Sequence, residues 1–208
     1  MRVLVVGAGG HGRVVADVVL EAGLATELAF VDDRHAALSQ SGPWPVVGTI
    51  AALPGLRDRY DAFALGIGSW QARSHVWQVL NRLGVRLLTA VHPRATVSRH
   101  ARLGEGTVVC AGAVVVIGAE LGRGCIVNTG ATVDHDCRLA DWVHVCPGAH
   151  LSGDVHVGQG SWIGAGSVVR QGIRIGESVT LGVGAACVRD LPAGVVAVGV
   201  PARAMRHD

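Results

Sequence analysis

The chain of 208 residues is long enough for one large domain or two small ones, each with its own hydrophobic core. Half of the residues are hydrophobic, yet only 4% are aromatic and 30 are glycine, so valine and alanine must supply most of the packing, which favours thin, regular layers of strand. The net charge of +2, with acidic and basic residues mixed along the chain, argues against nucleic acid as a partner.

Residues 1–92 have the pattern of alternating strands and helices. Strands are expected over 2–6, 28–31, 62–67 and 85–89, and helices over 12–22 and 72–83. The apolar side of the first helix is formed by Val14, Val15, Val18 and Val19. Because strands separated by helices pair in parallel, this part of the chain is predicted to be a small Rossmann-like α/β domain.

A glycine-rich loop, Gly7-Ala-Gly9-Gly10-His11-Gly12, joins the first strand to the first helix and satisfies GxGxxG. Asp32 and Asp33 end the next strand, at about the spacing of a nucleotide-binding acidic residue. Glycine here lets backbone N–H groups and the helix N-terminus meet a diphosphate. So short a domain forms about one mononucleotide-binding half, which argues against a dehydrogenase and for a single nucleotide diphosphate. A strand–helix junction without a ligand is the alternative.

From residue 93 onward the pattern changes to a strict period of six. Val, Leu or Ile stands at every sixth residue, without an insertion: Val97, Leu103, Val109, Val115, Leu121, Val127, Val133, Leu139, Val145, Leu151, Val157, Ile163, Val169, Ile175 and Leu181. Four residues after each of them the side chain is small or β-branched, with Ile173 as the only large one. Such a period fits a chain that makes a short strand and a corner every six residues. With three sides to a turn, these hexads predict about five coils.

This tract resembles the hexapeptide-repeat acyltransferases. The resemblance implies a left-handed parallel β-helix with a C-terminal extension over residues 93–208, acetyl-CoA as the cosubstrate, and a homotrimer with active sites between neighbouring subunits. The glycine-rich loop, the two aspartates and Gly66-Ile-Gly68-Ser69 extend the likeness to nearly the whole chain. Together they resemble the group of sialic-acid O-acetyltransferases and UDP-4-amino-sugar (bacillosamine-type) N-acetyltransferases.

In the N-terminal domain, this resemblance implies a binding site for a nucleotide-linked sugar. Contacts to the diphosphate or the sugar are implied for Gly9, Gly10 and His11. Asp32 and Asp33 would contact the nucleoside. Gly66 would lie close to the base.

His135, in the repeat tract, has surroundings suited to a general base. It follows the inward Val133 by two residues, so it lies near a corner rather than inside the coil, and Asp134 and Asp136 flank it. A nearby carboxylate raises the basicity of an imidazole. Such a base can take the proton from an amine or hydroxyl that attacks a thioester. A merely exposed polar corner is the alternative.

The resemblance supports His135 as the catalytic base, because the family's histidine follows an Asn-Thr segment, here Asn128-Thr129, and precedes a glutamate. Asp136 stands in the place of that glutamate and Asn128 is implied on the substrate side. Because aspartate is one methylene shorter than glutamate, Asp134 stays open as the residue that orients the ring.

Acetyl-CoA contacts are implied for four further residues: His144, Gly153, Ala165 and Gly184. His144 lies half a coil from His135, so it would reach the site of a neighbouring subunit. Gly153 follows His135 by one full coil and would stack above it, where its N–H could donate to the thioester oxygen. Ala165 and Gly184 fall where the family binds the pantetheine arm.

No segment has the pattern of a membrane anchor. The start, MRVLVVGAGG, lacks the layout of a signal peptide. The most apolar stretch, 108–119, contains glycine and is shorter than the about 18 residues that span a bilayer. The five cysteines form no CxxC pair and are interpreted as small buried thiols. The sequence therefore predicts a soluble, cytoplasmic protein that holds no metal.

The function expected from the sequence is N-acetylation, dependent on acetyl-CoA, of a nucleotide-linked amino sugar. The nearest alternative is sialic-acid O-acetylation. More remote are a non-catalytic module that binds a sugar nucleotide, and a γ-type carbonic anhydrase. The last needs three converging histidines, whereas the spacing of His135, His144, His150 and His156 places successive ones on different sides of a coil. The sugar and its nucleotide carrier stay open.

Overall fold

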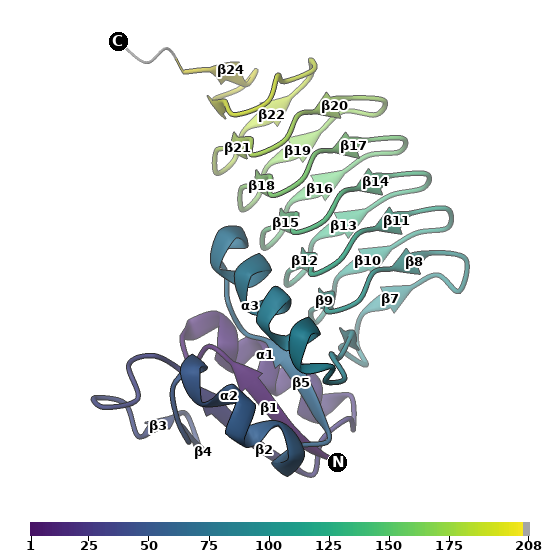
Figure 1. Ribbon diagram of the computed structural model, residues 1–208. Coiled ribbons are helices and arrows are strands. Elements are labelled where there is room, and N and C mark those ends of the chain that lie inside the picture. The colour runs from purple at the N-terminus through teal and green to yellow at the C-terminus, as the bar shows by residue number, and fades with distance from the viewer. Residues whose placement is uncertain (206–208) are drawn as a thin grey trace. The chain divides into compact units, whose positions relative to one another are not determined.

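The computed structural model describes residues 1–205, which divide into two compact units, Met1–His92 and the part from Pro93 onward (Figure 1). Each unit has its own core of buried aliphatic side chains. Within the described residues, no helix is both long and apolar enough to cross a membrane.

The first unit is built on a three-stranded parallel sheet. Its order is β2 (Glu27–Val31), β1 (Arg2–Val6), β5 (Ala62–Leu65). The helix α1 (Gly10–Glu21) packs against β1 and β5, and α3 (Trp70–Leu83) packs against β5. All strand residues except the first of β1 and of β2 are buried, as expected for a parallel sheet covered by helices.

The other elements of this unit are short. They are the hairpin β3 (Gln40–Ser41) and β4 (Trp44–Pro45), the 3₁₀ segments η1 (Ile50–Ala52) and η2 (Arg57–Arg59), α2 (Leu53–Leu56) and β6 (Ala90–Val91).

Several details of the prediction for this unit are wrong, including the start of the second helix, which is Trp70, and the end of the third strand, which is Leu65. The segment 85–89 is not a strand, because it pairs with β5 only around Phe63, through a single bridge to Leu87. The helix α1 begins at Gly10, two residues earlier than expected. Val14 is 38% exposed because it lies at the edge of the apolar stripe, whereas Val15 is buried.

The second unit is the left-handed parallel β-helix expected from the resemblance, with three flat faces of two-residue strands. The first face carries β7 (Thr96–Val97), β10 (Val114–Val115), β13 (Thr132–Val133), β16 (His150–Leu151), β19 (Val168–Val169) and β22 (Ala186–Cys187). The second face carries β8 (Arg102–Leu103), β11 (Glu120–Leu121), β14 (Arg138–Leu139), β17 (His156–Val157) and β20 (Arg174–Ile175). The third face carries β9 (Val108–Val109), β12 (Ile126–Val127), β15 (His144–Val145), β18 (Trp162–Ile163), β21 (Thr180–Leu181) and β23 (Val196–Val198), and β24 (Arg203–Ala204) pairs antiparallel with β23.

The aliphatic ladder fills the interior of the β-helix as the six-residue period predicts. Parallel pairing joins residues one coil apart, such as Val115 with Val133. From Val109 to Leu181 every residue of the ladder is buried, and only the two in the first coil are partly exposed. Burial of each such side chain contributes about 1.5–3 kcal/mol, so the ladder is the main source of stability in this unit.

Small polar residues at the inner corners join successive coils. The hydroxyls of Thr107 and Ser161 and the thiol of Cys137 each donate to a carbonyl oxygen fifteen residues on, at 3.1, 2.7 and 3.2 Å. These positions are therefore small because they lie against the backbone of the next coil, and polar because that backbone offers an unpaired acceptor.

The outer corners share one backbone conformation. From residue 106 to 184, every sixth residue has a positive φ, and most of them are glycine, which adopts this conformation without strain. Four positions hold another residue: Asp136, Trp142, Asp154 and Ser178. Side chains kept in this conformation cost stability, so these four are candidates for specific roles.

Candidate active site

The corner between β13 and β14, residues 134–137, holds the predicted base and is called here the His135 corner. The Nδ1 atom of His135 lies 2.9 Å from Oδ2 of Asp136. Asp134 instead accepts the backbone N–H of His135, at 2.9 Å. The side chain that contacts the ring is thus Asp136, which occupies one of the positive-φ positions, with φ 59°.

Two glycines on neighbouring coils leave room for this pair. A Cβ on Gly153, one coil after His135, would overlap the Cε1–Nε2 edge of the imidazole. A Cβ on Gly118, one coil before Asp136, would overlap that carboxylate. The backbone is also tied across the coils, because the N–H of Asp154 donates to the carbonyl oxygen of His135 at 2.9 Å. The pair is therefore held between two glycines, with Nε2 beside Gly153.

The carboxylates around His135 raise its pKa. The largest cause is the hydrogen bond to Asp136, followed by the negative charges of Asp134, Asp136 and Asp154. The side chain is 57% exposed, so a substrate can reach it. When Nδ1–H donates to Asp136, Nε2 carries the free lone pair. The corner thus presents a basic nitrogen to solvent, beside the N–H-bearing backbone of Gly153.

His144 and Asn128 lie together on the third face and its adjoining corner. The amide nitrogen of Asn128 is 3.1 Å from Nε2 of His144, and its amide oxygen accepts the N–H of Thr129 at 2.9 Å. The Asn128 amide therefore donates to the imidazole. A single chain does not bring this pair onto the corner of His135, because β15 belongs to a different face.

Ala165 and Gly184 are neighbours at the corner between the third and first faces. The N–H of Gly184 donates to the carbonyl oxygen of Ala165 at 2.9 Å. Gly184 has φ 67°, and the space that a Cβ would occupy there is open. The four residues predicted to bind acetyl-CoA thus lie apart in one chain: Gly153 is beside His135, His144 is on the third face, and Ala165 and Gly184 are at another corner.

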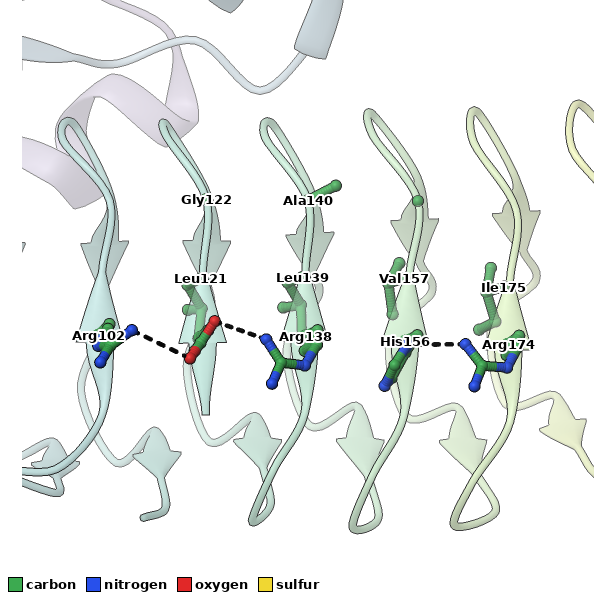
Figure 2. Close-up of a pocket in the computed structure, with 12 residues that line it drawn as sticks. Arg102, Leu121, Gly122, Arg138, Leu139, Ala140, His156, Val157, Arg174 and Ile175 are labelled. Carbon is green, nitrogen blue, oxygen red and sulfur yellow. Dashed lines mark hydrogen bonds and ion pairs between the residues drawn. The ribbon is translucent and has the colours of Figure 1, made fainter. Parts of the chain in front are cut away.

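The second face contains a shallow hollow of about 660 Å³ directly after the His135 corner (Figure 2). A row of polar side chains, three arginines, a glutamate and a histidine, crosses it, one from each coil. Glu120 accepts from Arg102 at 3.3 Å and from Arg138 at 2.8 Å, and Arg174 lies 3.0 Å from Nδ1 of His156. The predicted site residues do not include this row, although every eighteenth residue from Arg102 to Arg174 is an arginine, a glutamate or a histidine.

His156 connects this row to the next corner. Because the Arg174 guanidinium can only donate, Nδ1 of His156 is the acceptor and its proton is on Nε2. Nε2 in turn lies 3.3 Å from the carboxylate of Asp154. Asp154, whose negative charge raises the pKa of His135, is thus linked through His156 to the row on the second face.

The glycine-rich loop of the first unit is closely packed. A Cβ on Gly12 would overlap the carbonyl oxygen of Gly7, and a Cβ on Gly66 would lie 2.6 Å from the same oxygen. A Cβ on Gly10 would meet no other atom within 4 Å, so this side of the loop is open. Burial and the charge of Arg73 lower the pKa of His11 to about 4, so this ring is neutral at physiological pH. Gly66 has a packing role here, whatever it contacts in a ligand.

The two aspartates predicted to contact the nucleoside are hydrogen-bonded within the unit. Asp32 accepts the N–H of Ala8 at 2.8 Å and forms a paired contact with the guanidinium of Arg34. Asp33 accepts the N–H of Ile50 at 3.0 Å. Arg34 directly follows the aspartates in the sequence, but no pattern indicates that it folds back onto Asp32.

The thiol of Cys137 is not placed to act as a nucleophile. Burial raises the pKa of Cys137 to about 11, and the residue lies inside the coil. In the part of the chain that the structure describes, no three His, Cys, Asp or Glu side chains gather as metal ligands would.

Comparison with known proteins places these features in a family. Residues 2–80 match the family described as the PglD N-terminal domain. UDP-N-acetylbacillosamine N-acetyltransferase of Bacillus subtilis (strain 168) is 37% identical over 115 residues. That match covers 53% of this chain and about half (51%) of the relative's length.

Several solved structures match over nearly the whole chain. The acetyltransferase domain of PglB from Neisseria gonorrhoeae FA1090, in complex with acetyl coenzyme A, is 42% identical, with a TM-score of 0.94 and 98% of both chains covered. PerB from Caulobacter crescentus, in complex with CoA and GDP-perosamine, is 38% identical, also with a TM-score of 0.94, over 99% of this chain and 98% of that one. The chain therefore belongs to the hexapeptide-repeat acetyltransferases, in the group of sialic-acid O-acetyltransferases and UDP-4-amino-sugar N-acetyltransferases.

Proposed function

We propose that this protein transfers the acetyl group of acetyl-CoA to the amino group of a nucleotide-linked sugar, with His135 as the general base. The observation that carries the proposal is the His135 corner, where a carboxylate raises the pKa of an exposed imidazole. The relatives support the substrates, since one is named as an N-acetyltransferase, and PglB and PerB were solved with acetyl coenzyme A or with CoA and GDP-perosamine.

In the proposed mechanism, Nε2 of His135 takes the proton of the sugar amine as its nitrogen attacks the thioester carbon. Asp136 stabilises the imidazolium that forms at this step. The N–H of Gly153 stabilises the oxyanion of the tetrahedral intermediate. The carbon–sulfur bond then breaks, and the thiolate of coenzyme A takes up a proton as it leaves. No covalent enzyme intermediate is needed.

We further propose that the active form is a homotrimer. Support comes from the arrangement of the predicted coenzyme contacts, because His144, Ala165 and Gly184 lie away from the His135 corner of the same chain. A neighbouring copy could bring its own His144 to that corner. The mass of the particle in solution tests this: a monomer with full activity would contradict it.

The test of the acyl acceptor is the release of free thiol from acetyl-CoA, measured against UDP- and GDP-linked 4-amino sugars and free sialic acid. Release with an amino-sugar nucleotide is the expected result. Release with sialic acid alone would contradict N-acetylation and establish O-acetylation. Failure to bind acetyl-CoA at all would contradict the proposed function as a whole.

The test of the base is His135→Ala, which should lower kcat by about 10²–10⁴-fold, the usual contribution of a general base. His150→Ala is the matched control, because His150 is an exposed histidine on the first face whose ring lies 2.9 Å from the hydroxyl of Thr132. The melting temperature and particle mass of both variants should equal those of the unchanged protein. A wild-type kcat in His135→Ala would remove His135 from the mechanism.

A further inference from the structure

The carboxylate oxygens of Asp32 accept hydrogen bonds from groups of its own unit. Its Oδ2 accepts the N–H of Ala8 and the Nη2 of Arg34, both at 2.8 Å. Its Oδ1 accepts the backbone N–H of Arg34 at 3.0 Å and the Nε at 2.8 Å. A carboxylate has about four acceptor sites, so all are used. Asp32 is thus not available to accept the hydroxyls of a ribose, the role that a Rossmann-like acidic residue usually has.

What Asp32 does instead is hold Arg34 beside the glycine-rich loop. The Nη2 of Arg34 lies 3.8 Å from the position that a Cβ on Gly9 would have. Two of the five N–H groups of a guanidinium are spent on Asp32, and the others remain for a ligand. The paired contact fixes the plane of the guanidinium, although the Arg34 side chain is 62% exposed.

Arg34 and Arg13 both line a small cavity beside this loop. It measures about 260 Å³, and its walls are formed by Ala8, Gly9, Gly10, Arg13, Arg34, Leu38 and the hairpin residues Gln40, Ser41 and Gly42. Ser41 is buried and fixes the hairpin to the loop by donating to the carbonyl oxygen of Ala8 at 2.7 Å. The helix α1 begins at this cavity without a side-chain cap. Gly10, its first residue, lines the cavity, so the partial positive charge of the helix N-terminus lies beside this space.

The size and charge of this cavity select one part of a ligand. Small-molecule pockets usually measure about 300–1,000 Å³, so this cavity holds a fragment rather than a whole sugar nucleotide. Two guanidinium groups and a helix N-terminus favour the fragment with the highest negative charge, which is the diphosphate.

We propose that Arg34, held in place by Asp32, binds the diphosphate of the sugar nucleotide, and that Asp32 is a positioning residue rather than a nucleoside ligand. This inference rests on the proposed function, because it assigns residues to the substrate of that reaction. It differs from the sequence-based prediction, in which Asp32 itself contacts the nucleoside.

The test is the binding of UDP, GDP, uridine and guanosine to Arg34→Ala, measured by calorimetry. The affinity for the preferred diphosphate should fall about tenfold or more, as expected for the loss of a charged hydrogen-bonding contact, whereas the affinity for its nucleoside should change less than twofold. Arg2→Ala is the matched control. Arg2 also pairs with an aspartate, Asp61, but at the start of β1, whereas the loop follows the end of that strand. This control should bind as the unchanged protein does.

Asp32→Asn separates positioning from direct contact. It should weaken diphosphate binding, as Arg34→Ala does. The double variant should bind the diphosphate no more weakly than the weaker of the two single variants, because both changes break the same Asp32–Arg34 pair. Additive losses, an unchanged affinity in Arg34→Ala, or an equal loss for nucleoside and diphosphate would each overturn the inference. If the unchanged protein bound no nucleotide diphosphate, the proposed function itself would fail, a result distinct from these.

Discussion

Asp32 holds the guanidinium of Arg34 in the first unit, and Asp136 holds the imidazole of His135 in the second. The hydrogen bond from Arg34 keeps the pKa of Asp32 well below its usual range, and a guanidinium keeps its charge at any physiological pH. His135 has a raised pKa but can still lose its proton. An aspartate therefore fixes a permanent charge in the first unit, and another aspartate raises the pKa of a titratable base in the second.

The surroundings of the two pairs differ as well. Arg34 lies at ordinary contact distance from where a methyl on Gly9 would be, whereas the ring of His135 occupies the space of a methyl on Gly153. The first pair lies exposed at the surface of a loop, and the second is confined between coils. Three substitutions in the second unit test this contrast.

The largest effect is expected for Gly153→Ala. The added methyl must displace the ring of His135, and a shift of about 1 Å in a catalytic group can cost about 10²-fold in kcat. The KM for both substrates should change little, because the binding surfaces stay intact. Steady-state kinetics measure both constants. Gly55→Ala, whose methyl meets open space, is the control for the type of substitution. An unchanged kcat in Gly153→Ala would show that this confinement is not needed.

A smaller effect is expected for Asp136→Asn. Asparagine tolerates the positive φ of this corner, so the fold should be kept. Loss of the negative charge lowers the pKa of His135. Because the neutral imidazole is the base, activity rises as pH passes upward through that pKa, so the acidic limb of kcat/KM should move to lower pH. We expect kcat to fall about tenfold, a part of the whole contribution of the base. A pH–rate profile that stayed in place would contradict Asp136 as the partner.

The smallest effect is expected for Asp154→Asn. Asp154 raises the pKa of His135 by its charge alone, without a hydrogen bond to the ring. The acidic limb should move in the same direction as in Asp136→Asn but by less, with kcat within about twofold of the unchanged protein. The two profiles, measured side by side, rank the carboxylates. A larger shift in Asp154→Asn than in Asp136→Asn would reverse this ranking.

The sequence predicted the β-helix well, because a strict period places every sixth residue in the same environment. It also predicted that His135 lies near a corner with carboxylates beside it, since its distance from the inward Val133 fixes its place in the coil. It did less well where structure depends on a local turn. The return of Arg34 onto Asp32 depends on the backbone after β2, and no spacing encodes it. The segment 85–89 is rich in aliphatic residues like a strand, yet it pairs only around Phe63. The row on the second face follows a period of eighteen, which a six-residue reading conceals.

The positive-φ corners have a consequence for how such an enzyme can change. Corners one coil apart are equivalent in register, so Gly153-Asp154 occupies the same place in its coil as His135-Asp136. The reactive side chains are thus carried by a repeating backbone, and the repeat itself does not depend on them. Exchange of one corner residue can create, move or erase a reactive group while every strand keeps its partners. Such a scaffold separates the evolution of activity from the evolution of stability, and it offers many equivalent corner positions for design.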